Sequence, residues 1–364
     1  AGNLDGNARP EWNPDDDTMR NILMALRDPT ILVPAESIRN ISVAALNQPG
    51  VPNTVADAPA SYSRRGPGLR SGVKPDIAHY GGASQLGLFS VSPDGAMCRD
   101  AGTSYAAPLI AKTLAALDAK IEGDVSRETL MALLIHHAHI PGPLSRSPFR
   151  HVARDFVGFG LPTSSDEMLN VPDAAITLVF AGRLGPRMQF IFDFAWPRVL
   201  TTDTGACKGH VRMTLVSTPP LDHDWKSEIA RVNIEPALQQ QQIKGEAIRW
   251  KGHPNKYMES VLPTRPGSYE LDRIREGLKW SPVKCYEAQF PRGVGNSSIW
   301  RLQVDALARA EYVIPNDGVP FTVLLTIRDI EGDAPVFNDM RAQLQAAGAR
   351  LADIQTASRV TPRV

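Results

Sequence analysis

The residues best suited to chemistry lie in the stretch RDAGTSYAAPLIAKTL, residues 99–114. Gly102, Thr103 and Ser104 come directly before small apolar residues that predict a helix from about Ser104 to Lys120. A serine at a helix start has two interpretations. It is either a cap that accepts a hydrogen bond from a backbone N–H, or a nucleophile whose oxyanion the N–H groups of the helix start would stabilise.

Further segments lie around this serine in a fixed order. They are AGN (1–3), ILVPAESIRNISVAAL (31–46), YSRRGP (62–67), KPDIAHYGG (74–82), GTSYAAPLIA (102–111) and VGFGLPTS (157–164). In this order they resemble segments of the subtilisin-like serine proteases, whose motifs include F-S-S-R-G-P, K-P-D-I-V-A-P-G and G-T-S-x-A-x-P. The resemblance covers residues 1 to about 170.

The resemblance implies roles for two residues. Ser104 corresponds to the nucleophile that attacks a peptide carbonyl and forms an acyl-enzyme. Asn3 corresponds to the side-chain donor of the oxyanion hole, and the Ser104 backbone N–H is the second donor. Without the other matches, Asn3 reads as a solvated residue near a chain end. The implied function is a serine endopeptidase acting on a polypeptide substrate.

The family's aspartate and histidine motifs precede its asparagine motif, which here is at residue 3. None of the eight histidines lies in an H-G-T-H-V-type setting, and His79 reads as a packing histidine. A hydroxyl without a base is a poor nucleophile. We therefore expect this chain alone to be nearly inactive and to act with the missing N-terminal part of the catalytic domain. The alternative is a non-catalytic interaction protein on a degenerate subtilisin scaffold.

Other clusters predict neither a metal nor a cofactor. His136, His137 and His139 crowd a predicted helix end, where cations suit the helix dipole, and no cysteine or carboxylate cluster lies nearby. No phosphate-binding loop, H-E-x-x-H or paired C-x-x-C motif occurs. The basic residues at 64, 65, 70 and 74 read as a solvated loop.

The composition excludes some partners. Thirty-nine basic residues balance thirty-nine acidic ones, so no overall field favours nucleic acid or an acidic membrane. No apolar run approaches the roughly 20 residues that span a bilayer. Cys98, Cys207 and Cys285 are scattered and odd in number, which favours a reducing compartment and predicts a cytoplasmic location.

The elements expected to position the site are of α/β type. Helices are predicted over 13–29, 104–120 and 125–140, and short strands over 30–35, 40–46 and 73–82, with a hairpin around Pro93-Asp94-Gly95. Residues 1–170 would form part of a subtilisin-like parallel-sheet domain. Lacking their sheet neighbours, its strands at 31–46 and 74–80 are expected to expose an edge and an apolar face.

The chain changes character near residue 170. Alternating segments such as SIWRLQVDAL (298–307) and FTVLLTIRD (321–329) predict an antiparallel β-sandwich over 171–335, followed by a C-terminal helix and tail over 336–364. The helix is expected at about 336–356 and QQQQ (239–242) is expected in a loop. GHVRMTLVSTPPLD (209–222) resembles a strand and turn in the accessory domain of bacterial subtilases, where such domains stabilise the catalytic domain or dock substrates and partners.

Overall fold

The fold was analysed in a computed structural model of the chain. It describes residues 1–4, 9–13, 15–17, 19, 23, 30–68, 72–83, 85–170, 172–244, 247–252, 258–260 and 279–349. The chain divides into two compact units: the first comprises Ala1–Ala116, His137–Ser164 and Leu262–Ser281, and the second comprises Leu117–His136, Ser165–Val261 and Pro282–Val364. The domain boundaries predicted from the sequence, after residues 170 and 335, remain predictions.

The first unit contains a short parallel pair of strands. β1 (Val43–Leu46) pairs with β2 (Ile77–Tyr80) in register from Val43 opposite Ile77 to Leu46 opposite Tyr80. This pair is the part of the predicted parallel sheet that the described residues show. All of β1 is buried. Its side chains contribute to a hydrophobic cluster that also contains Trp12, Phe149 and Phe156. The expected exposed apolar face is therefore wrong for β1, because aromatic side chains of the same unit cover it.

Short elements complete this unit around α2 (Thr103–Lys120), which continues into the second unit. They are β3 (Leu88–Val91), β4 (Met97–Asp100), β5 (Ala138–His139), α4 (Gly142–Ser145), η1 (Phe149–His151), α5 (Ala153–Val157) and β6 (Leu161–Pro162). β3 and β4 pair antiparallel, which confirms the predicted hairpin. Its turn contains Gly95 at φ +82°, a conformation that suits glycine.

Two elements predicted near the start of the chain are not confirmed. The strand expected over 30–35 is wrong, because residues 33–36 form turns in which the Ala35 N–H donates to the Leu32 carbonyl over 2.8 Å. Pro34 lies in these turns and has no N–H to offer a sheet neighbour. The helix expected over 13–29 lies largely outside the described residues.

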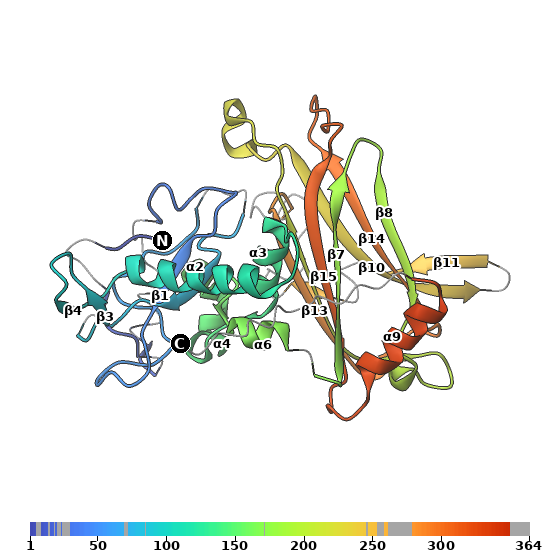
Figure 1. The fold of residues 1–364 in the computed structure, drawn as a ribbon, viewed down its shortest axis with the longest axis horizontal. Helices are drawn as coiled ribbons and strands as arrows, with labels where there is room; N and C mark the ends of the chain where they lie inside the picture. The colour runs from blue at the N-terminus through green and yellow to red at the C-terminus, as the bar shows by residue number, and fades with distance from the viewer. Residues whose placement is uncertain are drawn as a thin grey trace, which may run out of the picture. The chain divides into compact units, whose positions relative to one another are not determined.

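The second unit is dominated by two antiparallel sheets (Figure 1). One has the order β11-β10-β14-β8 and the other the order β12-β13-β9-β15-β7. Their strands are β7 (Ala175–Leu184), β8 (Gln189–Ala195), β9 (Cys207–Ser217), β10 (Val232–Lys244), β11 (Ala247–Lys251), β12 (Glu259–Ser260), β13 (Val283–Val294), β14 (Ile299–Ala308) and β15 (Val319–Arg328). The remaining elements are α3 (Arg127–His136), α6 (Ser165–Leu169), η2 (Arg198–Leu200), η3 (His223–Glu228) and α9 (Val336–Ala346).

A single apolar core joins the two sheets. Trp300, Leu302 and Val304 of β14 are fully buried in the same cluster as Val323 and Leu325 of β15. These are alternate residues, as the sequence pattern predicts for strands with one face in a core. No helix within the described part of the chain is long and apolar enough to cross a membrane.

The glutamine run is a strand and not the predicted loop, because residues 239–242 lie within β10. Gln240 is fully buried, and its Nε2 donates to the carbonyls of Ser297 (2.6 Å) and Val294 (3.1 Å). A polar residue can occupy an inward strand position when its amide finds such partners. The last helix is shorter than expected: α9 ends at Ala346, and residues 350–356 lie outside the described part.

α3 packs on the outer face of the five-stranded sheet, against β9 and β15. Ser126 precedes the helix and caps it, because its Oγ accepts a hydrogen bond from the Thr129 N–H over 3.1 Å. His136 ends the helix and is buried, with its ring nitrogens bonded to Thr214 Oγ1 (2.9 Å) and Thr326 Oγ1 (2.7 Å). His136 at the helix end is thus held between two strands of the sheet by its ring nitrogens.

Candidate functional site

Ser104 is the second residue of α2 and is exposed, whereas Thr103 before it and Ala106 two residues after it are buried. The helix is not capped by this serine. The first N–H of α2, from Thr103, donates to Asn3 Oδ1 over 3.0 Å. The capping interpretation of Ser104 therefore does not apply, and its hydroxyl faces solvent at the positive end of the helix.

Asn3 is held against the helix start by its side chain. Asn3 Oδ1 accepts a second hydrogen bond, from Thr103 Oγ1 over 3.1 Å, and Thr103 Oγ1 also accepts the Gly2 N–H over 3.2 Å. With Oδ1 occupied by two donors, the Nδ2 group faces the other side. A Cβ added to Gly102 would lie 3.0 Å from Asn3 Nδ2 and 3.8 Å from the Ser104 nitrogen. Glycine at 102 thus leaves the space between the two nitrogen donors open.

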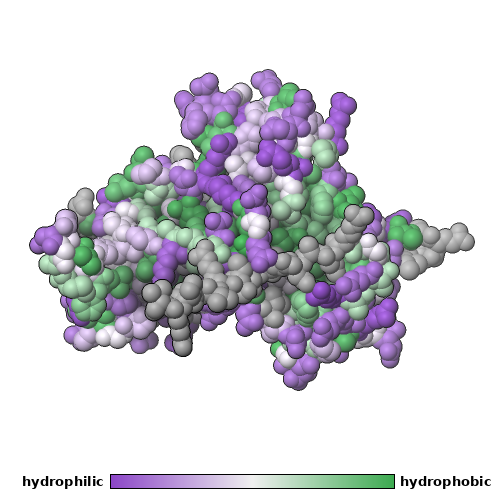
Figure 2. Space-filling model, viewed as in Figure 1, coloured by the Kyte–Doolittle hydropathy of each residue, from purple (hydrophilic) through white to green (hydrophobic). Residues whose placement is uncertain are grey.

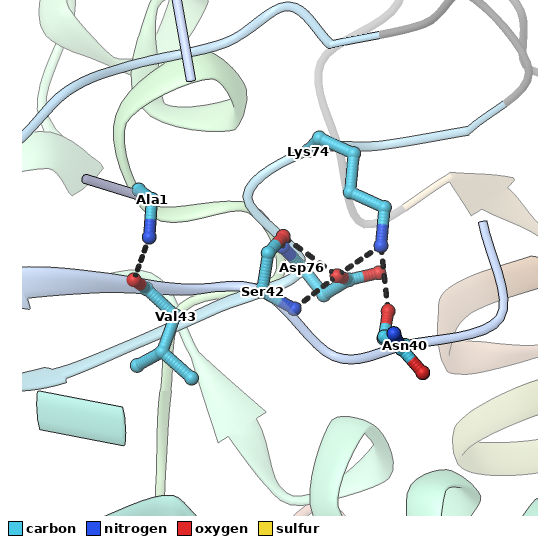
Figure 3. A network of polar contacts seen from close by, with 6 residues as sticks. All are labelled: Ala1, Asn40, Ser42, Val43, Lys74 and Asp76. Carbon is cyan, nitrogen blue, oxygen red and sulfur yellow. Dashed lines mark hydrogen bonds and ion pairs between the residues drawn. The ribbon is translucent and has the colours of Figure 1, made fainter. Parts of the chain in front are cut away.

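The backbone of Asn3 is held by the segment around Ser63. Asn3 and Ser63 form an antiparallel bridge, flanked by hydrogen bonds from Leu4 N to the Tyr62 carbonyl (2.7 Å) and from Arg64 N to the Gly2 carbonyl (2.9 Å). The Ala1 nitrogen donates to the Val43 carbonyl over 2.7 Å, so the segment that carries Asn3 lies beside β1 (Figure 3).

A glycine-rich junction fixes the other side of the site. The Gly102 N–H donates to the Gly81 carbonyl over 2.8 Å, and the Tyr62 hydroxyl donates to the Gly82 carbonyl over 2.6 Å. A Cβ on Gly81 would lie 2.8 Å from both the Gly102 oxygen and the Tyr62 hydroxyl. Burial raises the pKa of Tyr62, which keeps this hydroxyl protonated as a donor. These contacts therefore hold the residues that follow β2 against the start of α2.

The arrangement offers two hydrogen-bond donors beside an accessible hydroxyl. In the described part of the chain no residue accepts the Ser104 N–H, and no side chain bonds to the Ser104 hydroxyl. Ser104 N and Asn3 Nδ2 both lie close to the position that a Cβ on Gly102 would occupy, and two donors placed together in this way are suited to bind one oxygen atom. No described group activates Ser104.

His79 is not a displaced base for Ser104. Its Nδ1 accepts a hydrogen bond from the Tyr80 N–H over 2.8 Å. Burial lowers the pKa of His79, so the neutral ring that this bond requires is favoured. This is the environment of a packing histidine.

A second polar cluster of this unit is buried, at the start of β2 (Figure 3). Lys74 Nζ lies 2.6 Å from Asp76 Oδ2 and donates to the Asn40 carbonyl over 2.7 Å. Asp76 Oδ2 also accepts the Ser42 N–H (2.7 Å) and the Ser42 hydroxyl (2.9 Å). Burial raises the pKa of Asp76, and Lys74 and Ser42 oppose that shift. The reading of Lys74 as part of a solvated basic loop is wrong.

The described residues contain no group of three or more His, Cys, Asp or Glu side chains placed to hold a metal ion. Cys98, Cys207 and Cys285 are free thiols. The sequence suggested no role in the site for Thr103 or Tyr62 and placed Arg64 in a solvated loop, although each contacts the site. Their contacts join segments up to about 100 residues apart, and no local pattern marks such pairs.

Comparison with known proteins supports a family assignment. The model of the subtilase family matches residues 6–167. The chain is also 27% identical over 194 residues to the uncharacterized protein y4bN of Sinorhizobium fredii, a match that covers 47% of this chain and 44% of that protein. The chain thus spans less than half of that relative's length. Residues 6–167, which carry Ser104 at the start of α2, are thus similar to the subtilase family.

Proposed function

We propose that this chain forms part of a serine endopeptidase in which Ser104 is the nucleophile and Asn3 supplies the oxyanion hole. The observation that carries the proposal is the approach of Asn3 to the helix start, across 100 residues of sequence, with its Oδ1 held by Thr103. That contact leaves the amide Nδ2 and the Ser104 N–H free beside an exposed hydroxyl.

The chemistry follows from these groups. Ser104 Oγ attacks the carbonyl carbon of a peptide bond and gives its proton to a general base. The carbonyl oxygen becomes an oxyanion that accepts hydrogen bonds from Asn3 Nδ2 and Ser104 N. The C–N bond then breaks, and the amine leaves with the proton from the base. Water hydrolyses the ester on Ser104 by the same steps and releases the acid.

The general base and its carboxylate partner would come from a further part of the catalytic domain. Two apolar surfaces in the first unit support a partner of this kind. Ala107, Ala111 and Ala115 are exposed on α2 at spacings that place them on the face of Ser104. Phe89, Val91 and Met97 are exposed on the hairpin that leads into Gly102, where Figure 2 shows apolar residues at the surface. Apolar surfaces of this kind mark sites of further packing.

The test is labelling by a fluorophosphonate probe, which reacts with an activated serine. The complete protein, including any segment before residue 1, should be labelled at Ser104 and should cleave polypeptides. Ser104→Ala should abolish both, whereas Ser145→Ala, at an exposed serine of α4, should change neither. Asn3→Ala should lower kcat about 10²- to 10³-fold, the usual effect of removing one oxyanion donor.

The opposite outcome favours the non-catalytic alternative. A folded, complete protein that is neither labelled nor able to cleave polypeptides would contradict the peptidase proposal. The scaffold would then serve as an interaction module, in which the exposed apolar surfaces contact a partner and not a segment that carries the base.

A further inference from the structure

The carbonyl of Asn3 is bound by a charged side chain that the peptidase chemistry above does not use. Arg64 Nε donates to the Asn3 carbonyl oxygen over 2.8 Å, and Arg64 Nη1 donates to the Thr30 carbonyl over 3.2 Å. The side chain is half-buried. A single guanidinium therefore ties the segment of Asn3 to the loop at Thr30.

The strand geometry explains why a side chain is needed at this carbonyl. The two hydrogen bonds of the Asn3–Ser63 bridge belong to the flanking residues, from Leu4 N to Tyr62 O and from Arg64 N to Gly2 O. In such a non-hydrogen-bonded pair, the facing residue turns its own N–H and C=O away from the partner strand. The Asn3 carbonyl thus has no backbone donor in the Tyr62–Arg64 segment, and the Arg64 guanidinium supplies one.

This contact bears on the orientation of the Asn3 amide. The side chain is fixed at Oδ1 by Thr103, and the peptide from which it extends is fixed by Arg64. A hydrogen bond from a charged donor is stronger than one from a neutral donor. Arg64 is also a position at which the chain departs from the F-S-S-R-G-P pattern, which has a serine there.

We propose that Arg64 is a positioning residue for the oxyanion hole, acting through the peptide of Asn3. The inference rests on the proposed peptidase function and adds a residue to it. Arg64 touches neither substrate nor Ser104 in this role; it keeps the Asn3 amide at the distance and angle at which Nδ2 can reach the oxyanion. Misplacement of a catalytic group by about 1 Å can cost up to about a hundredfold in rate.

A double-mutant cycle in the complete protein tests this role. Arg64→Gln should lower kcat about tenfold with KM unchanged, because the loss falls on the transition state. In an Asn3→Ala background, Arg64→Gln should have almost no further effect on kcat, because the amide it positions is gone. Arg146→Gln, at an exposed arginine of the same unit, is the matched control and should leave both constants unchanged.

The outcomes separate this inference from the proposed function. If the wild-type protein is neither labelled at Ser104 nor active, both fail together. If the wild type is active and Arg64→Gln behaves like Arg146→Gln, or lowers kcat by the same factor with and without Asn3, only the role of Arg64 fails. Should Arg64→Gln not fold, Arg64→Met, which keeps the aliphatic part of the side chain but has no donor, is taken through the same cycle with the same expected outcomes.

Discussion

The start of α2 shows how one residue can serve both the fold and the chemistry. Asn3 Oδ1 caps the Thr103 N–H, and this cap sets the direction of Nδ2. Gly102 contributes by having no side chain, since a Cβ there would lie 3.0 Å from Nδ2. A contact at 3.0 Å is tighter than nearly all real Cβ contacts, so the neighbouring amide would have to move. The oxyanion-hole interpretation thus depends on the lack of a Cβ at Gly102 as well as on the two nitrogen donors.

His79 gives a prediction at the residue scale. Burial holds its folded-state pKa below the ordinary value of 6.5, so the unfolded chain takes up a proton first as pH falls. The contribution of His79 to the free energy of unfolding should therefore be complete above about pH 7.5. It should decline as pH falls through 6.5 and should be lost once pH is below the folded-state pKa. The slope is at most about 1.4 kcal/mol per pH unit, and partial exposure reduces it.

The measurement is urea denaturation of the chain at pH 8 and pH 5.5. His79→Asn keeps a side-chain acceptor for the Tyr80 N–H and does not titrate, so it should lose less stability between these two pH values than the wild type. Equal losses in the two proteins would show that His79 does not contribute to the pH dependence.

At the scale of elements, the β1–β2 pair is secured by an ion pair at one end and by packing along its length. Lys74 and Asp76 are almost completely buried, at 3% and 6% side-chain exposure. Buried charges are tolerated when each has several partners. Here Asp76 accepts from Lys74 and from two groups of Ser42, while Lys74 also bonds to Asn40.

Lys74→Met should therefore be strongly destabilising. Removing one partner of a buried pair typically costs about 3–5 kcal/mol, because the remaining charge loses its compensation. Lys120→Met is the matched control: Lys120 pairs with Asp166, whose side chain is 82% exposed, and such pairs contribute about 1 kcal/mol or less. Thermal unfolding of both variants measures the difference. A Lys74 variant as stable as the Lys120 variant would contradict this account.

At the scale of the whole molecule, a segment of the subtilase match packs against a sheet of the β-rich unit. α3 lies within residues 6–167, yet it belongs to the second unit and packs on β9 and β15. The contact is partly polar: Thr129 Oγ1 lies 2.9 Å from Thr322 Oγ1, and His136 bonds to Thr214 and Thr326. The β-rich unit therefore includes a helix from the segment that matches the subtilase model.

His136→Leu should weaken the second unit although His136 lies outside the sandwich sequence. The substitution removes the two hydrogen bonds that join the ring to hydroxyls on two strands, and each hydrogen bond typically contributes about 0.5–1.5 kcal/mol. His139→Leu, at an exposed histidine three residues on, should change stability by about 0.5 kcal/mol or less. Chemical denaturation followed by tryptophan fluorescence reports on this unit, since Trp196 and Trp300 lie in its core. Equal midpoints for the two variants would contradict the coupling.

The sequence by itself determined the elements whose pattern is local. Alternation placed Trp300, Leu302 and Val304 on an inward face, a proline–glycine turn predicted the β3–β4 hairpin, and the order of the motifs pointed to the subtilase family. These inferences succeed because periodicity and turn chemistry depend on neighbours along the chain.

Only the tertiary structure decided which polar residues are paired. The contacts of Asn3 with Thr103 and Arg64, the burial of Lys74 and the inward position of Gln240 join residues that are distant in sequence. Whether a polar side chain is solvated or buried depends on whether the fold brings a partner within hydrogen-bond distance, because an unpaired polar group is costly to bury. That condition is set by packing, so the sequence suggested a nucleophile at Ser104 while the fold determined which donors lie beside it.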